Sequence, residues 1–574
     1  MSTVRTPSER SKRSKKKTRI YTTDNELLDL KVEIPEKKDD KFSFHKLWAF
    51  TGPGFLMSIA YLDPGNIESD LQAGARAGFK LLWVLFMAHI VGFLLQRLSA
   101  RLGVVSGKHM AEIAYYYYPT IPRLILWIMV EIAIIGSDMQ EVIGTSIAFY
   151  LLSYGYIPLY VGVLITSLDT FLFLFLDTYG FRKLEAFFAF LITTMALTFG
   201  FEYITVKPSQ LEVIKGTFIP WCSHCGSTEL LQAVGMVGAV IMPHNLYLHS
   251  ALVKSRAVDR SHRKKVVEAN FYFFIESGVA LLCSFIINLF VVSVFATGLF
   301  NKTDFQVRTM CDAQGNVLDA DVFGYDNKTV EADIFKGGIF LGCAFGLPAL
   351  YVWAVGIWAA GQSSTMTGTY TGQFVMEGFL HIQWPRWKRV MFTRAIAIAP
   401  TLIVALMFNG VRDLTGMNDF LNCVQMIQLP FALIPIITFT ASSNIMKDFR
   451  NGRTVQIFSL IVSCIVIVIN LLFFGDFVTD RIGRQWYTLL GIVFASIIYF
   501  TFVSYLIGHC LLAMEVPCVS FLKKIPWLRK PDIRTDAPWI TMSQMSGVIG
   551  YERTPQQSNG GNEIVDIKGI PPNC

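Results

Sequence analysis

The stretch that decides the fold reads Gly52-Pro-Gly-Phe-Leu-Met-Ser-Ile-Ala60-Tyr-Leu-Asp63-Pro64-Gly65-Asn66 and lies inside a long apolar segment. Pro64 lacks a backbone donor and Gly65 loosens the chain, so we expect a helix to unwind at this point. In a membrane, irregular backbone persists only where it is buried in protein or lines a cavity. An ionisable group in such a break is a functional candidate. Asp63 is that group, although it could also serve only to cap the second half of a kinked helix.

The composition places most of the chain in lipid. Of the 574 residues, 53% are hydrophobic and only 16% are charged, with a mean hydropathy of +0.45. Soluble domains have about 45–50% apolar and about 25% charged residues. These values exclude soluble enzymes, nucleic-acid-binding proteins and small secreted domains held by disulfides.

About twelve apolar segments follow one another, each long enough to cross a bilayer as a helix. They cover residues 47–76, 80–100, 123–151, 157–177, 184–204, 229–253, 270–298, 336–360, 390–409, 420–443, 454–474 and 487–513. We therefore predict an all-α integral membrane protein. Its polytopic domain, residues 46–515, lies between a disordered basic N-terminal tail, 1–45, and a C-terminal tail, 516–574.

Lys and Arg in the connections orient the helices, because cytosolic loops carry an excess of both. The basic run Lys254–Lys265 falls on the same side as the N-terminal tail. The largest opposite connection, residues 299–335, is acidic and holds glycosylation sequons at Asn301 and Asn327. The sequence thus predicts that both termini are cytosolic and that this loop is external.

The sixth segment has a break of its own. It reads Gly235-Met-Val-Gly-Ala239-Val-Ile-Met242-Pro243-His244-Asn245, so a proline again interrupts an apolar run. Segments one and six cross the membrane in opposite directions. Five helices followed by five inverted helices, with breaks at corresponding positions, is the pattern of inverted-repeat secondary transporters. In that architecture the substrate binds at the midplane between the two breaks.

The side chains at the breaks suggest the substrate. Asp63 and Asn66 offer hard oxygen donors and Met242 offers a soft thioether, while unwound backbone frees carbonyls such as those of Ala60 and Ala239. Calcium and magnesium prefer shells made only of oxygen, whereas a thioether favours softer transition ions. We therefore expect a site for a divalent transition-metal ion.

Segment three carries three acidic residues in an apolar run. At 100° per residue, Glu131 lies about 20° from Asp138 and Glu141 about 60° from it, so the three share one stripe. Lipid does not accommodate such a stripe, which must face the protein interior or a water path. With His244 nearby it could relay protons, with Arg394 of segment nine as a charge partner. The alternative is a set of structural hydrogen bonds between helices.

Three cysteines, Cys222, Cys225 and Cys311, fall in external connections. Disulfide bonds are the common fate there, but the spacing assigns no partners and a zinc site remains an alternative. A further five lie in apolar runs and are interpreted as small hydrophobic residues: Cys283, Cys343, Cys423, Cys464 and Cys510.

Asp63-Pro-Gly-Asn66 and Met242-Pro-His-Asn245 together resemble the paired motifs of the Nramp family of proton-coupled divalent metal transporters. The stretch Gly361-Gln-Ser-Ser-Thr-Met-Thr-Gly-Thr-Tyr-Thr-Gly-Gln-Phe-Val-Met-Glu-Gly378 is similar to the family's transport motif, expected in the cytosol after helix eight. The resemblance covers about residues 45–515.

This resemblance implies a LeuT-like 5+5 inverted repeat, no enzymatic activity and no permanent cofactor. It implies import of Mn²⁺ or Fe²⁺ with protons, through the plasma membrane or an endosomal or lysosomal membrane, without any nucleic-acid partner. The implied metal ligands are Asp63, Asn66, Met242, the carbonyls of Ala60 and Ala239 and, in some states, Gln428. The implied proton pathway comprises Asp138, Glu141, His244 and Arg394.

Two other functions compete with this one. A sodium-coupled carrier of organic solutes such as amino acids would share the architecture, but the anionic Asp63 would repel a carboxylate substrate. An integral-membrane enzyme could hold a metal at Asp63, His244 and Met242, yet catalytic zinc prefers His, Cys or carboxylate ligands.

Overall fold

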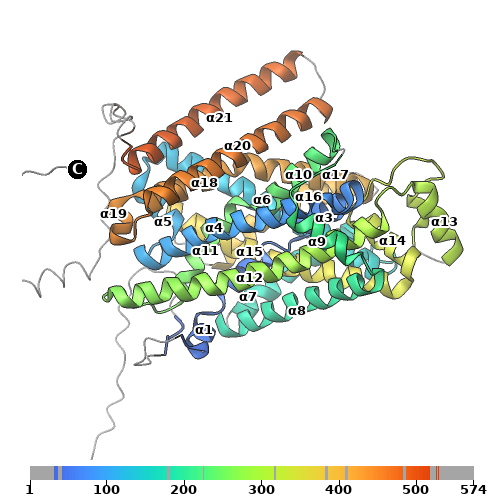
Figure 1. The fold of residues 1–574 in the computed structure, drawn as a ribbon, viewed down its shortest axis with the longest axis horizontal. Coiled ribbons are helices and arrows are strands. Elements are labelled where there is room, and N and C mark those ends of the chain that lie inside the picture. Colours follow the sequence, from blue (N-terminus) through green and yellow to red (C-terminus); the bar gives the residue numbers. More distant parts are fainter. Residues whose placement is uncertain are drawn as a thin grey trace, which may run out of the picture.

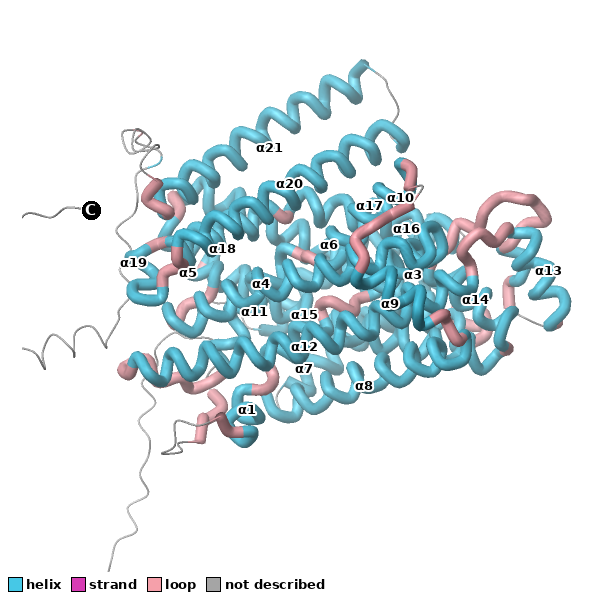
Figure 2. The backbone as a smooth tube through the Cα atoms, viewed as in Figure 1, coloured by secondary structure: helices cyan, strands magenta, loops and turns pink. Residues whose placement is uncertain are grey.

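The computed structural model describes residues 31–35, 42–177, 181–223, 225–315, 318–381, 386–407, 411–481 and 486–516, together with Ile525 and Leu528. Helices make up nearly all of these residues, and loops lie mainly at helix ends (Figure 2). Extended pairing within the described ranges is limited to two isolated bridges, Val32 with Arg256 and Thr303 with Thr329. The predicted all-α class is confirmed.

The helices follow the expected segments in chain order. From the first segment through the third, the chain forms α1 (Phe44–Phe50), α2 (Pro53–Ile59), α3 (Pro64–Ala77), η2 (Gly78–Leu81), α4 (Leu82–Ser106), α5 (Met110–Tyr117) and α6 (Thr120–Leu152), with α5 in a connection. From the fourth segment through the seventh, it forms α7 (Leu159–Asp177), α8 (Phe181–Val206), α9 (Gln210–Phe218), α10 (Ser227–Val240), α11 (Pro243–Leu252), η3 (Val253–Ser255) and α12 (Arg263–Gly298), with α9 in a connection. The long loop and the remaining segments contain α13 (Asp304–Gln314), η4 (Ala320–Val322), α14 (Ile334–Phe345), α15 (Leu347–Leu380), α16 (Arg386–Met407), α17 (Val411–Gln428), α18 (Pro430–Ala441), α19 (Ser443–Met446), η5 (Lys447–Phe449), α20 (Arg453–Arg481) and α21 (Trp486–Ala513).

Seven stretches of the described chain are long and apolar enough to span a bilayer. They are Pro64–Ser106, Thr120–Leu152, Lys183–Val206, Thr228–Ser255, Arg263–Gly298, Phe420–Ala441 and Leu490–Ala513. Helices α7, α15, α16 and α20 occupy the other expected segments, and among the residues that the structure describes shorter apolar helices cover Leu159–Leu168, Ile334–Phe345 and Arg453–Val468. The glycosylatable loop with α13 lies at one end of the bundle, and α1 and α19 lie at the other (Figure 1).

Both expected breaks are present. The first separates α2, which ends at Ile59, from α3, which begins at Pro64. The second separates α10, which ends at Val240, from α11, which begins at Pro243. In each case the proline occupies the first helical position, where its missing N–H costs no hydrogen bond and its fixed φ suits the helix.

Two boundaries differ from the expectation. Segment eight, placed at 336–360, is divided at Gly346, whose φ of 89° ends α14. The motif at 361–378, placed in a cytosolic connection, is instead the buried second half of α15. Its small residues lie against α6: a Cβ on Gly361 would fall 2.0 Å from the Thr145 hydroxyl. Small residues let two membrane helices approach closely, so this polar sequence is buried in protein instead of facing water.

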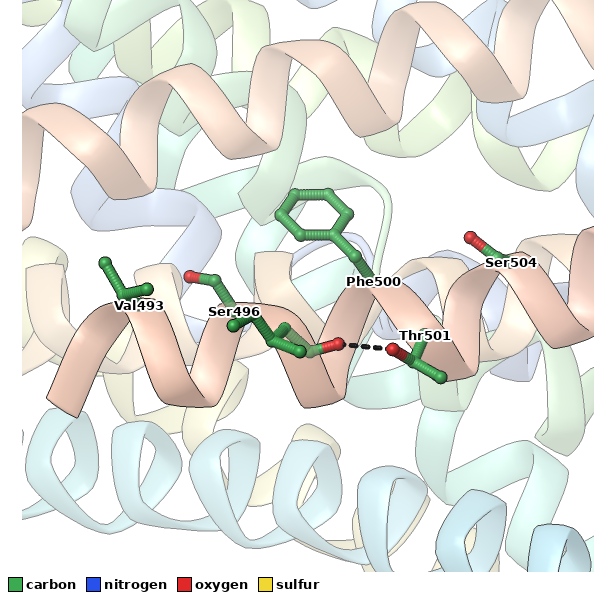
Figure 3. Close-up of a pocket in the computed structure, with 6 residues that line it drawn as sticks. Val493, Ser496, Phe500, Thr501 and Ser504 are labelled. Atoms are coloured by element: carbon green, nitrogen blue, oxygen red, sulfur yellow. Dashed lines mark hydrogen bonds between the residues drawn. The ribbon is translucent and has the colours of Figure 1, made fainter. Parts of the chain in front are cut away.

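Helices α20 and α21 lie along one edge of the bundle (Figure 1). A hollow on α21 is lined by Val493, Ser496, Ile497, Phe500, Thr501 and Ser504 (Figure 3). The Thr501 hydroxyl donates to the Ile497 carbonyl at 2.7 Å, which satisfies the polar group within its own helix (Figure 3). The hollow is open along one outer face of α21 and lies on a different element from the two breaks, so we assign it to the lipid-facing surface.

Candidate functional site

The two helix breaks meet inside the protein. The Asn245 side chain, in the first turn of α11, donates from Nδ2 to the carbonyl of Ala60 at 3.1 Å. Ala60 is the C-cap of α2 and is 4% exposed, and Asn245 is 1% exposed. One hydrogen bond therefore joins the end of the first half-helix in segment one to the start of the second half-helix in segment six.

Asp63 caps α3, and it also keeps a free oxygen. Its Oδ1 accepts from the Asn66 backbone N–H at 3.2 Å and from the Asn66 side-chain amide. Asp63 thus does cap the second half-helix, as the structural alternative for this residue expected. Within the described part of the chain, Asp63 Oδ2 and Asn66 Oδ1 have no hydrogen-bond partner, although both residues are only 1% exposed. Buried acceptors without a donor are rare in native proteins, and these two suit a cation.

Met242 and Ala239 lie at the second break. Met242 is the N-cap of α11 in an extended conformation and is 2% exposed. Ala239 lies in the last turn of α10, where helix carbonyls lack the next turn's N–H groups as partners. Within the described ranges no three His, Cys, Asp or Glu side chains come together as a metal cage. A metal ion at the breaks must therefore use the amide, carbonyl and thioether donors together with Asp63.

Two further residues expected at the site are Gln428 and Arg394, and the structure describes the side chain of Gln428 alone of these two. Gln428 is the last residue of α17, is 6% exposed and keeps an Oε1 without a partner among the described groups. It precedes Leu429, which separates α17 from α18 but keeps helical φ and ψ, so Phe420–Ala441 forms one apolar stretch within the expected segment 420–443. Arg394 lies in α16, but its side chain is outside the described residues.

The acidic stripe of α6 divides into two environments. Asp138 and Glu141 are 2% and 1% exposed and lie against α15, where a Cβ on Gly368 would fall 2.4 Å from Asp138 Oδ1. Glu131 instead accepts from Trp127 Nε1 at 2.9 Å within α6. His244 is buried on α11, and its Nδ1 has no partner in the described part of the chain. The structure thus places Asp138 and Glu141 together and gives Glu131 a local structural bond.

A chain of amide side chains, which the sequence reasoning missed, connects α6 to α17 and α3. Gln140 Nε2 donates to Asn422 Oδ1 at 2.8 Å, and Gln425 Nε2 donates to Gln140 Oε1 at 2.6 Å. Asn418 Nδ2 in turn donates to Glu68 Oε2 at 2.6 Å. The signal was available, because residues 418, 422 and 425 are spaced i, i+4 and i+7 on one face of a helix.

Helix α12 holds the unwound backbone of the first break. Ser284 Oγ donates to the Ser58 carbonyl and Asn288 Nδ2 donates to the Tyr61 carbonyl, each at 2.9 Å. Both α12 residues are fully buried. The Asn288 bond gives the Tyr61 carbonyl a donor, and the Ser284 bond adds one to the Ser58 carbonyl, which also accepts from the Tyr61 N–H at 3.2 Å. Together they fix the backbone on either side of Ala60.

The three cysteines that the sequence predicts in external connections form disulfides. Cys222 is bonded to Cys225, and Cys311 is bonded to Cys343. The interpretation of Cys343 as a small hydrophobic residue was wrong, because the fold brings the start of segment eight beside α13. With Cys222, Cys225 and Cys311 all paired, the zinc alternative loses its thiolate ligands.

The two sequons lie side by side in the long loop. Asn301 and Asn327 are exposed, and the threonines of their sequons, Thr303 and Thr329, form an antiparallel bridge. The bonds that flank the bridge run from the Asp304 N–H to the Lys328 carbonyl at 2.9 Å and from the Val330 N–H to the Lys302 carbonyl at 3.2 Å. Both asparagine side chains are thus accessible in this loop.

Comparison with known proteins agrees with this geometry. Residues 54–476 match the family described as natural resistance-associated macrophage protein-like, or Nramp. The chain is 61% identical over 530 residues to the NRAMP-like transporter smf-1 of Caenorhabditis elegans, which spans 92% of this chain and 93% of that protein. It is 62% identical over 492 residues to natural resistance-associated macrophage protein 2 of Homo sapiens, covering 86% of this chain and 85% of the relative.

A crystal structure of a variant of the Eremococcus coleocola manganese transporter is similar to this structure, with a TM-score of 0.72 at 28% identity. The match covers 87% of this chain and 100% of that one. The fold, with two broken helices at corresponding positions of an inverted repeat, and the family match extend over the same region. The chain belongs to the Nramp family, whose members are metal-ion transporters, and it is a multi-pass membrane protein.

Proposed function

We propose that this protein is a secondary active transporter that imports divalent transition-metal ions, Fe²⁺ and Mn²⁺ among them, into the cytosol together with protons. The family membership supports transport of a divalent metal, and a solved relative is named as a manganese transporter. The N-terminal tail and several connections are basic, as cytosolic segments are. The sequons lie at the other end of the bundle from the basic connections, which supports cytosolic termini. The host membrane would be the plasma membrane or that of endosomes or lysosomes.

The observation that carries the proposal is a pair of buried acceptor oxygens at one helix break and a buried thioether at the other, with one hydrogen bond joining the two breaks. Asp63 Oδ2 and Asn66 Oδ1 lie at the first break without donors in the described chain, and Met242 lies at the second. The Asn245–Ala60 bond joins the two breaks. We assign the metal to Asp63, Asn66, Met242 and the carbonyls of Ala60 and Ala239, with Gln428 joining in states where α17 moves inward.

The mixed donor set explains the choice of ion. One carboxylate supplies a single fixed charge, so an ion can be held by neutral oxygens and sulfur and still be released. A thioether improves binding of softer ions and does nothing for Ca²⁺ or Mg²⁺. A site that must release its cargo benefits from such a loose shell, in contrast to the four fixed ligands of a structural zinc site.

For the protons we propose a pathway through Asp138, Glu141 and His244, with Arg394 as a further charge. Asp138 and Glu141 are buried ionisable groups on one helix, and His244 lies two residues after the ligand Met242. Buried ionisable side chains of this kind mark proton relays in transporters. The alternative sodium-coupled carrier is disfavoured by Asp63, since a carboxylate substrate would meet a buried anion.

Uptake by the purified protein in proteoliposomes tests the function. With radioactive manganese outside, we expect an inward proton gradient to accelerate uptake, and an inward sodium gradient at constant pH to have no effect. Asp63→Ala vesicles provide the matched control for leakage. Stimulation by sodium alone, or manganese uptake no faster than in the Asp63→Ala vesicles, would overturn the proposal.

A further inference from the structure

A short extended segment before the first helix lies across the connection that follows the sixth segment. The Val32 N–H donates to the Ser255 carbonyl at 2.9 Å, and the Ala257 N–H donates to the Val32 carbonyl at 3.0 Å. The two strands run parallel. Ile34 packs against the hydrophobic core. Residues 31–35, which we call the strap, thus add a strand to residues 255–257 in the way that peptides augment an exposed edge.

The residue between the two strap bonds, Arg256, holds the turn that joins α1 to α2. The Arg256 side chain is buried, and its Nη2 donates to the Thr51 carbonyl at 2.6 Å and to Glu185 Oε1 at 2.7 Å. Thr51 ends α1, and Glu185 lies in the first turn of α8. Because the strap binds Ser255 and Ala257, on either side of Arg256, a movement of Arg256 away from Thr51 either carries the strap with it or breaks these two hydrogen bonds.

The first turn of α2 packs closely against the charged groups of Arg256, Glu185 and Glu276. The N–H groups of Gly52 and Gly54 both donate to Glu276 Oε1 on α12. Gly52 has a φ of 148°, and a Cβ there would fall 2.1 Å from Glu185 Oε1 and 2.2 Å from Arg256 Nη2. No other residue type fits this position, so the charged groups hold α2 by its backbone.

The chain between the strap and α2 has a second attachment, on α12. The Ser43 N–H donates to the Tyr272 hydroxyl at 3.0 Å, and Lys46 forms an ion pair with Glu268. Phe50 stacks on Tyr272 with ring centroids 5.2 Å apart. The N-terminal residues thus fasten the half-helix that carries Ala60 at two separate places.

We propose that the strap is part of the cytosolic gate: strand addition of residues 31–35 to residues 255–257 keeps α2 seated, and the strap must detach before metal leaves to the cytosol. This inference rests on the proposed function for the direction of transport. Alternating access requires one repeat to move against the other around the fixed site. The half-helix α2 lies between the site at Ala60 and the end of the bundle where the basic connections lie.

A pair of proline substitutions isolates the strap. Val32→Pro removes the N–H that bonds Ser255, whereas Glu33→Pro places the same ring at a position whose N–H takes no part in the two bridge bonds. A proline at 33 also favours the extended conformation that Val32 already adopts. Both changes lie outside the proposed metal site. The measurement is amide hydrogen exchange of the full-length protein in lipid nanodiscs, followed in residues 255–257 and in α2.

We expect Val32→Pro to accelerate exchange about tenfold in both segments, on the scale of one lost net hydrogen bond, and Glu33→Pro to leave both unchanged. Faster exchange confined to residues 255–257 would show that the strap does not hold α2 and would overturn the proposal, as would no change in either segment. In manganese uptake, Val32→Pro should raise the initial rate, and an unchanged rate would overturn the gating role. A wild-type protein that carries no metal would refute the proposed function while leaving the exchange result standing.

Discussion

Two substitutions of Met242 distinguish the contribution of its sulfur from the contribution of its side-chain volume. The side chain is 2% exposed at the second break. Met242→Leu keeps nearly the same volume and removes the sulfur, and volume-conserving exchanges of this kind cost less than about 1.5 kcal/mol of stability. Met242→Ala removes both sulfur and volume, and truncation of a buried Met to Ala costs about 2–5 kcal/mol. If the sulfur binds the ion, both variants should therefore lose the same selectivity while differing in stability.

Competition uptake with cadmium, manganese and calcium on both variants tests this. We expect the preference for cadmium over manganese to fall about tenfold or more in each, a loss of ~1.4 kcal/mol in relative binding. Manganese accepts oxygen ligands and should lose little, while calcium should begin to compete. Thermal unfolding serves as the control and should distinguish Ala from Leu. Equal losses for all three ions, or an unchanged cadmium preference in Met242→Leu, would mean that the sulfur is not a ligand.

Three further substitutions address charge. Asp63→Ala should abolish metal uptake in a protein that still folds and inserts, and near-normal uptake with normal surface expression would contradict the assignment. Asp138→Asn should flatten the pH dependence of uptake more than it weakens metal affinity, and a wild-type pH profile would place the proton route elsewhere. Burial alone would raise the pKa of Glu112. His109 and Lys254, whose Nζ lies 2.8 Å from Glu112 Oε2, outweigh burial and lower the pKa to about 2. A carboxyl group whose folded pKa is lowered stabilises the fold above its unfolded pKa of about 4.3, and this contribution is lost as the pH falls toward 2. Glu112→Gln should therefore cost about 1.5–3 kcal/mol at neutral pH, the range for a lost hydrogen bond to a charged group. The cost should shrink in acid, as thermal unfolding at several pH values would show.

Local chemistry made the two helix breaks predictable. Pro64 and Pro243 cannot donate a hydrogen bond, so the interruption of each apolar run follows from the covalent structure of the residue. Each proline then begins the next half-helix, with Asp63 or Met242 as its N-cap. The inverted arrangement required only the count of segments between the breaks.

Tertiary contacts decided what the sequence could not show. The polarity of residues 361–378 is compatible with a watery loop or with a helix buried in protein, and only the packing of Gly361 and Gly368 against α6 distinguishes them. The Cys311–Cys343 bond likewise depends on how the long loop folds back. The Asn245–Ala60 bond joins residues 185 positions apart, and no local sequence pattern predicts it.

That bond also bears on how the site can both hold and release an ion. A carbonyl oxygen has two lone pairs, so Ala60 can accept from Asn245 and still face a cation. Asn245 Oδ1, Asp63 Oδ2 and Asn66 Oδ1 are all acceptors, and within the described chain none of them has a donor. A buried acceptor left without a partner costs about 1–3 kcal/mol. These three, two at the first break and one at the second, therefore favour any state in which a cation satisfies them. Because the donor that joins the breaks comes from α11 and the acceptor from α2, movement of either half-helix changes the shell, and the same motion that opens a path can weaken the binding of the ion.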